Sequence, residues 1–246
     1  MDASFELKYH RLEDHHPWFV ARREILHDLL KMVPRDGAIL DVGCASGVLL
    51  QELEQKGYSN LSGLDISPQA VELSKERGLK NIYLMDGADP KFPPDTFDCI
   101  IASDIFEHID QEKTTINNWK KILKENGIII CFVPAFNFLW SRHDRANHHF
   151  RRYTRARLAR LFNASGLTVI RSSYWNFFLF FPTAIIRFIQ RLFPEKKDGD
   201  NLPVIKNGLA RWAMIFLPHL EKYLLRYINF PVGVSTFVIA KKITKQ

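Results

Sequence analysis

Three aspartates in the first third of the chain lie where ligand-binding carboxylates are expected. Asp41, Asp65 and Asp86 each stand at or next to the end of an apolar run. A carboxylate at the end of a strand can accept hydrogen bonds from both ribose hydroxyls of a nucleoside. Three successive apolar runs that end in an acid therefore predict a nucleoside cofactor site, rather than ordinary turns between strands and helices.

A glycine-bearing turn follows the first of these aspartates, in the sequence DVGCASG from Asp41 to Gly47. Glycine has no Cβ, so the backbone at Gly43 and Gly47 can approach a ligand closely. The helix expected after Gly47 directs its first N–H groups at the same crevice and favours negative charge there.

A second group of residues could transfer protons. Two short segments, 104–108 and 143–149, each carry acids and histidines. Such side chains can remove a proton from a substrate hydroxyl when they lie within hydrogen-bond reach of it. The candidates for a catalytic role are His143, Asp144, His108 and His148, and Asp104, Glu107 and His149 lie beside them.

Residues 142–160 contain seven arginines and one acid. Arginine binds planar oxyanions in a bidentate manner, so this stretch predicts contact with a phosphate or carboxylate on the substrate. The alternative is a solvated, charged loop and helix face. The histidines and Asp144 show no established metal-ligand spacing, and the arginines would repel a cation, so we expect no metal. The predicted substrate-binding residues are Arg142, Arg151, Arg152 and Tyr153.

The elements that must position these residues alternate between strand and helix. Continuous apolar runs predict strands buried on both faces, and the alternation predicts a doubly wound, mainly parallel seven-stranded sheet of the α/β class. Ser67-Pro68 and Thr154 are typical helix starts. Strands are expected at residues 38–42, 61–66, 81–85, 97–102, 127–133, 167–173 and 233–241. Helices are expected at 13–33, from Gly47 to about 56, from Ser67-Pro68 onward, at 116–123 and at 154–164.

The pattern changes after residue 174. Residues 175–232 are rich in aromatic and apolar side chains, interrupted by the polar stretch 195–201. We expect a largely helical, apolar insertion at 175–232 that follows a core of residues 1–174. Residues 233–246 then supply the last strand of that core and a tail.

The cofactor segment resembles the class I S-adenosylmethionine-dependent methyltransferases. DVGCASG is similar to their first motif, with Ala45 in place of the middle glycine, and residues 94–109 resemble their fourth-strand region. The resemblance implies a Rossmann-like methyltransferase fold and S-adenosyl-L-methionine as cofactor. It implies that Gly43 and Gly47 surround the methionine part, that Asp65 holds the ribose, and that Asp86 and Gly87 hold the adenine. The remaining members of the predicted cofactor site are Asp41, Cys44, Ile66 and Ser103.

A nicotinamide dehydrogenase is the main alternative within this fold class. Its fingerprint requires Gly-x-Gly-x-x-Gly, whereas Gly43 is followed here by Cys44, Ala45, Ser46 and Gly47. That assignment would also leave Asp86 and Gly87 without a role.

Residues 143–154, together with the early segment 14–24, resemble a bacterial and archaeal branch of these enzymes. Members of this branch are associated with the modification of cell-surface glycans or lipids. The resemblance implies that the N-terminal helix covers the cofactor as a lid, with Trp18, Phe19 and Arg22 on its inner side. Core packing of an amphipathic helix is the alternative role for these three side chains.

The composition of the chain indicates which kind of partner and which cellular compartment suit the protein. The 246-residue chain has a formal net charge of +7, which suits an anionic partner. Its three cysteines match no zinc pattern and favour buried free thiols in a reducing compartment. The chain begins without a secretory signal, so we expect a cytoplasmic protein.

The apolar segments between residues 175 and 230 are too short to span a bilayer and have the composition of interfacial segments. They predict contact with the inner face of a membrane. The alternative is a cap that packs on the substrate site or on a second subunit in a homodimer.

Three functions are consistent with these residues. The first is a methyltransferase that acts on a small or lipid-linked acceptor with an anionic group, at oxygen. The second is an RNA or other nucleic-acid methyltransferase. The Asn/Asp-Pro-Pro-aromatic motif of base-nitrogen enzymes is replaced by Ser103-Asp104-Ile105-Phe106, which disfavours a nucleic-acid substrate. The third is a non-catalytic cofactor-binding partner subunit, which the intact acids at positions 41, 65 and 86 disfavour.

Overall fold

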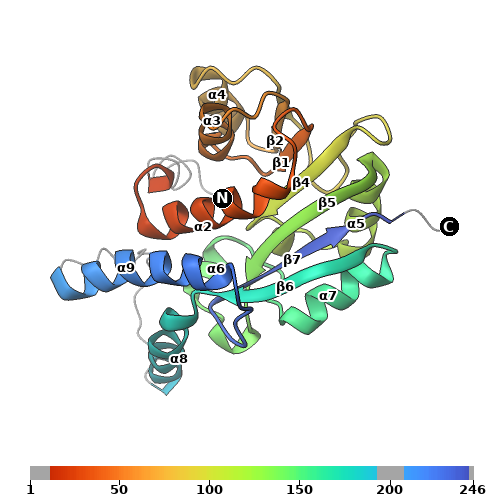
Figure 1. The fold of residues 1–246 in the computed structure, drawn as a ribbon. Helices are drawn as coiled ribbons and strands as arrows, with labels where there is room; N and C mark the ends of the chain where they lie inside the picture. The colour runs from red at the N-terminus through yellow and green to blue at the C-terminus, as the bar shows by residue number, and fades with distance from the viewer. Residues whose placement is uncertain (1–11, 193–207, 244–246) are drawn as a thin grey trace.

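A seven-stranded sheet with the order β3-β2-β1-β4-β5-β7-β6 forms the centre of the computed structural model, which describes residues 12–192 and 208–243 (Figure 1). Strands β1 to β5 pair in parallel, whereas β7 runs antiparallel to both β5 and β6. The predicted doubly wound, mainly parallel sheet is confirmed. The strands are β1 (Ile39–Val42), β2 (Leu61–Asp65), β3 (Ile82–Leu84), β4 (Phe97–Ser103), β5 (Leu123–Pro134), β6 (Thr168–Trp175) and β7 (Ser235–Lys241).

Helices connect the strands and cover both faces of the sheet. Two of the predicted helix starts are present. Ser67 accepts a hydrogen bond from the amide of Ala70, and Thr154 accepts one from the amide of Arg157. The helical segments are α2 (Pro17–Leu29), η1 (Leu30–Met32), α3 (Val48–Gln55), α4 (Pro68–Glu76), η2 (Phe106–His108), α5 (Glu112–Ile122), η3 (Asn137–Leu139), α6 (Arg142–Ala146), α7 (Arg155–Ala164), α8 (Phe177–Leu192) and α9 (Gly208–Leu225).

Strand β5 shows why the apolar runs are continuous. Ile128 and Ile130 belong to the buried cluster that includes the apolar face of α2, whereas Ile129 and Cys131 belong to the cluster that includes α5 and α7. Successive side chains point to opposite faces of a strand, so a strand covered by helices on both sides needs an apolar residue at every position.

The beginning of β5 differs from the sequence expectation. Residue 123 was expected on the helix and the strand was expected from 127, but Leu123 already pairs with Phe97 of β4. The intervening Lys124, Glu125 and Asn126 have the composition of a turn, and Asn126 has a positive φ of 63°. Pairing with a distant strand overrides local propensity here.

The predicted insertion is helical: α8 and α9 lie between β6 and β7 in the sequence. Figure 1 shows both helices extending to one side of the sheet. A β-bridge joins Tyr174 to Phe230, so the chain leaves and re-enters the core at neighbouring points. Helix α9 packs on α2, and no residue of α8 is buried. The polar stretch 195–201 lies outside the described residues.

Two further expectations concern the thiols and the apolar segments. Cys44, Cys99 and Cys131 are all free and buried, as predicted. Within residues 12–192 and 208–243, no helix combines the length and the apolar character needed to cross a bilayer.

Candidate functional site

The turn after β1 has the backbone shape that the DVGCASG sequence suggested. Gly43 and Gly47 have φ values of 73° and 78°, in the left-handed region that glycine adopts at little cost. Ala45, at the position of the missing middle glycine, is also left-handed, with φ of 49°. The amides of Gly43 and Cys44 both donate to the carbonyl of Leu64, which ties the turn to β2.

Asp65 lies at the end of β2, next to this turn. Its Oδ2 accepts a hydrogen bond of 3.0 Å from the Ala45 amide, and its Oδ1 accepts one of 2.9 Å from the Ser67 amide. Each carboxylate oxygen has a further lone pair, so Asp65 can shape the turn and still accept hydrogen bonds from ribose hydroxyls. Ile66 follows it with 70% of its surface exposed, although it is apolar.

Asp86 and Gly87 lie in the loop after β3. The Asp86 side chain is exposed, and its Oδ1 accepts a hydrogen bond from the Ala88 amide at 2.8 Å. The Gly87 carbonyl accepts one of 2.8 Å from the Trp119 indole. A Cβ at Gly87 would lie 2.8 Å from Cγ1 of Val42, so only glycine lets this loop approach β1.

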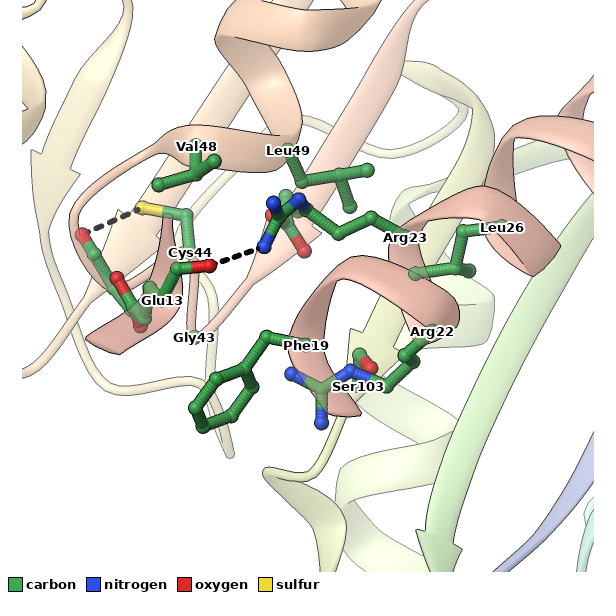
Figure 2. Close-up of a pocket in the computed structure, with 12 residues that line it drawn as sticks. Glu13, Phe19, Arg22, Arg23, Leu26, Gly43, Cys44, Val48, Leu49 and Ser103 are labelled. Atoms are coloured by element: carbon green, nitrogen blue, oxygen red, sulfur yellow. Dashed lines mark hydrogen bonds between the residues drawn. The ribbon is translucent and has the colours of Figure 1, made fainter. Parts of the chain in front are cut away.

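A pocket lies between helix α2 and the turn after β1 (Figure 2). Phe19 and Arg22 of α2 line it together with Gly43, Cys44 and Ser103. Two of the three predicted lid residues therefore face the pocket. Trp18 instead packs against Trp175 at a ring separation of 5.1 Å, in the alternative role of core packing.

The pocket contains polar groups that a polar ligand would contact. The Ser103 hydroxyl is buried and has no hydrogen-bond partner among the described residues. Burial raises the pKa of Asp41 to about 8, an effect that Arg22 opposes and that Asp65 and Glu13 increase. Arg22 forms an ion pair with Asp104. An orphaned hydroxyl at the end of β4 fits a ligand that supplies the missing partner.

The second candidate group is organised around Asp144. This side chain is completely buried, and Arg152 binds it through two hydrogen bonds, of 2.7 and 2.9 Å. The Ser141 amide and hydroxyl donate to it as well, and His149 Nδ1 lies 3.0 Å from its Oδ1. These partners hold its pKa well below the usual range of a carboxyl, despite burial. A carboxylate bound this way is suited to holding its neighbours in position and poorly suited to accepting a proton.

The predicted substrate-binding residues divide into two pairs. Arg152 and Tyr153 are buried, at 8% and 0% exposure, so both side chains pack inside the protein and stabilise the loop. Arg142 and Arg151 are half-buried. Arg151 forms ion pairs with Asp110 and Glu112. Arg151 and Arg157, which also pairs with Glu112, are therefore balanced by acids from outside 142–160.

The histidines occupy different environments. His108 and His149 lie together with a ring separation of 4.5 Å, and His143 stands 6.0 Å from His149. Burial is the main cause that lowers the pKa of His108 to about 4. His148 is exposed, with a left-handed φ of 55°. Glu107, beside His108, is 1% exposed, and burial raises its pKa to about 8.

Two side chains at the site had not been expected from the sequence. Glu13 accepts a hydrogen bond from the Ser46 hydroxyl in the cofactor turn. Arg187 of α8 lies close enough to Arg152 and Asp144 for their charges to affect its pKa, which burial lowers. Neither residue belongs to a local motif, and only the fold brings it to the site. For Arg187, the one available signal in the sequence was its position within an otherwise apolar segment.

A family model described as "Methyltransferase domain" matches residues 15–172, which is more than half of the chain. The chain belongs to this methyltransferase family. The fold and the glycine turn described above agree with that assignment, and S-adenosyl-L-methionine is the cofactor of the domain. When bound, the cofactor supplies an activated methyl group on a sulfonium, and the protein's part is to align the acceptor with it and exclude water.

Among the similar proteins, human EEF1A lysine methyltransferase 2 is 31% identical over 130 residues, which cover 47% of this chain and 53% of the relative. The ubiquinone biosynthesis O-methyltransferase of Neisseria meningitidis is 23% identical over 153 residues, 53% of this chain and 63% of the relative. The chain thus spans less than two thirds of these relatives' own length.

A solved structure of similar fold is the geranyl diphosphate C-methyltransferase from Streptomyces coelicolor in complex with Mg²⁺, geranyl diphosphate and S-adenosyl-L-homocysteine. It has a TM-score of 0.63 and 13% identity, and the match covers 91% of this chain and 78% of that one. At this level of identity the similarity concerns the fold.

Proposed function

We propose that this methyltransferase acts at oxygen on a small or lipid-linked acceptor that carries an anionic group, at the inner face of a membrane. The observation that carries the proposal is the exposed apolar face of α8, which lies beside the loop after β5. The apolar residues of α8 that are at least half exposed are Phe181, Ile185, Ile186, Phe188, Ile189 and Leu192. A face of this kind is typical of interfacial helices.

A groove lies between this face and η3. Phe138 of η3 lines it with Ala184, Ile185 and Phe188 of α8, and Arg191, which also lines it, donates to the Phe138 carbonyl at 2.8 Å. Because η3 follows β5, an apolar chain in the groove would lead toward the carboxyl end of the sheet. Ligands of doubly wound folds bind at that edge.

Arg187 supports an anionic group on the acceptor. Its Nε is buried and has no hydrogen-bond partner among the described residues, while one of its terminal nitrogens donates to Gln190. A buried guanidinium N–H without an acceptor is costly, and a phosphate or carboxylate would satisfy it. The S. coelicolor neighbour shows that this fold accommodates an apolar chain joined to a diphosphate.

Binding to vesicles tests the membrane part of the proposal. We expect the purified protein to co-sediment with vesicles of phosphatidylcholine and phosphatidylglycerol, and Ile185→Glu to reduce the bound fraction at least tenfold, because it places a charge on the apolar face. Ile170→Glu is the matched control, since Ile170 is also about half exposed but lies on β6. Equal loss in both variants, or no binding of the wild type at low salt, would contradict the proposal.

Labelled S-adenosylmethionine tests the acceptor. After incubation with cell extract, we expect label in the lipid or glycan-precursor fraction. Label confined to RNA would favour a nucleic-acid substrate, and label confined to protein would favour a lysine acceptor like that of the human relative. No label in any fraction, with cofactor binding intact, would favour a cofactor-binding partner subunit.

A further inference from the structure

Glu107, His108 and His149 come together where η2 meets the loop after α6. One ligand atom from each of these side chains lies within 4.8 Å of the other two. The rings of His108 and His149 are nearly perpendicular, at 85°. We propose that these three residues bind a divalent transition metal ion, with Zn²⁺ as the best-matched species.

The buried carboxylate of Glu107 is the first sign that a ligand belongs here. This residue is 1% exposed, and its Oε2 has no hydrogen-bond partner in the part of the chain that the structure describes. A buried carboxylate oxygen without a donor is costly, and a cation coordinated by it removes that cost.

His149 is oriented as metal-binding histidines are. Its Nδ1 lies 3.0 Å from Asp144 Oδ1, which leaves Nε2 as the nitrogen available to a metal. Metal-ligating histidines commonly donate their other ring N–H to a carboxylate, which fixes the ring and makes it a stronger ligand. Arg152 donates to both oxygens of that carboxylate, and the Ser141 hydroxyl donates to Oδ2. Asp144 thereby gains a role as a positioning residue for His149.

The positive charges nearest to the three ligands are paired with carboxylates, so a cation is not strongly repelled. Arg152 is paired with Asp144 and Arg22 with Asp104, so each arginine that influences Glu107 is balanced by its own carboxylate. A metal bound here would displace the proton of Glu107, whose pKa burial raises, and the ionised carboxylate would then supply a negative charge. We expected no metal from the sequence because the arginines would repel it and no ligand spacing is present. In the structure, Glu107 and His108 lie on η2, His149 lies in the loop after α6, and Arg22 and Arg152 are each paired with a carboxylate.

The donor set indicates the type of metal. Two imidazoles and one carboxylate suit Zn²⁺ and similar ions better than Mg²⁺, which prefers oxygen ligands. Three protein ligands leave a coordination position for water or substrate. The site follows β4, whose Ser103 lines the cofactor pocket. A metal here could bind the acceptor's oxygen and lower the pKa of its hydroxyl, a role that rests on the proposed function.

Metal binding can be measured without methyl donor or acceptor, so its failure is distinct from failure of the proposed function. Chelator-treated protein is titrated with Co²⁺ and followed by visible absorption, and Zn²⁺ is then added in competition. We expect ligand-field bands that Zn²⁺ removes and Mg²⁺ does not. His149→Ala and His108→Ala should each weaken Co²⁺ binding at least tenfold.

His148→Ala is the matched control, since His148 is the exposed neighbour of His149 and should leave the titration unchanged. Circular dichroism of each variant establishes that it is folded, and the two histidine variants change different loops, so one of them suffices if the other does not fold. Absence of bands in the wild type, or equal loss in His148→Ala, would overturn the proposal.

Discussion

At the residue scale, the cofactor turn departs from its family pattern at Ala45. The motif has glycine at this position. Here an alanine is held at a φ of 49°, because its amide donates to Asp65 and its carbonyl accepts from the Ser74 hydroxyl. A left-handed conformation costs a non-glycine residue about 1–2 kcal/mol. Hydrogen bonds from neighbouring residues therefore stabilise the turn, although the Ala45 side chain disfavours this conformation.

We predict that Ala45→Gly stabilises the protein. Removal of the Cβ relieves the left-handed conformation, and part of that gain is offset by the greater freedom of glycine in the unfolded chain. The free energy of unfolding in urea should rise by up to about 1 kcal/mol. Ala159→Gly in α7 is the control and should lower it by about 1 kcal/mol, because α7 needs no left-handed residue there. A decrease of equal size in both variants would show that the turn is unstrained.

At the element scale, α8 depends on a carboxylate from α9. Glu221 is 1% exposed, and its two oxygens accept hydrogen bonds from the Phe177 amide at the first turn of α8, at 3.1 and 2.9 Å. Burial raises the pKa of Glu221 from 4.5 to about 7, although the amides of Asn176, Phe177 and Phe178 oppose the shift. The two apolar helices are thus joined through one buried titratable group.

This carboxyl should make stability depend on pH. Because its pKa is higher in the folded state, the folded protein binds the proton more tightly, so the contribution of Glu221 to stability is fully present below pH 4.5 and is lost as pH rises through 7. Glu221→Gln keeps an acceptor oxygen but cannot titrate. Between pH 4 and pH 8 the stability of the wild type relative to this variant should fall by about 3 kcal/mol in urea titrations. Parallel pH profiles would show that Glu221 titrates normally.

At the scale of the whole molecule, the last strand completes both layers of the core. Phe237 and Ile239 belong to the cluster on the α2 side, and Val238 and Ala240 belong to the cluster on the side of α5 and α7. Strand β7 also stands between β5 and β6, which pair with it rather than with each other. Strand β7 is therefore an interior strand of the sheet, one position from the edge formed by β6.

We predict that a chain ending at residue 232 does not fold. Such a chain leaves β6 without a partner strand and removes buried side chains from both faces, a loss far larger than the usual 5–15 kcal/mol stability of a domain can absorb. Circular dichroism should show no cooperative thermal transition. Titration with S-adenosylhomocysteine should produce no measurable heat of binding. A folded, cofactor-binding truncated chain would contradict the central role of β7.

The sequence by itself determined the strands, the order of helix and strand, the glycine turn, and the acids at positions 41, 65 and 86. These features are local, because alternation, apolar runs, helix starts and left-handed turns each depend on a few neighbouring residues. The parallel sheet and the cofactor class followed from them and are confirmed. The acceptor and the domain boundaries stay predictions.

Only the tertiary structure decided what the charged residues of 142–160 do. Their composition suggested an open, substrate-binding loop, but Asp144, Arg152 and Tyr153 are buried, and Arg151 pairs with acids that are distant in the sequence. A sequence does not show which opposite charges will meet, because burial and pairing depend on contacts between distant segments. For the same reason, no spacing revealed that Glu107 and His108 would meet His149.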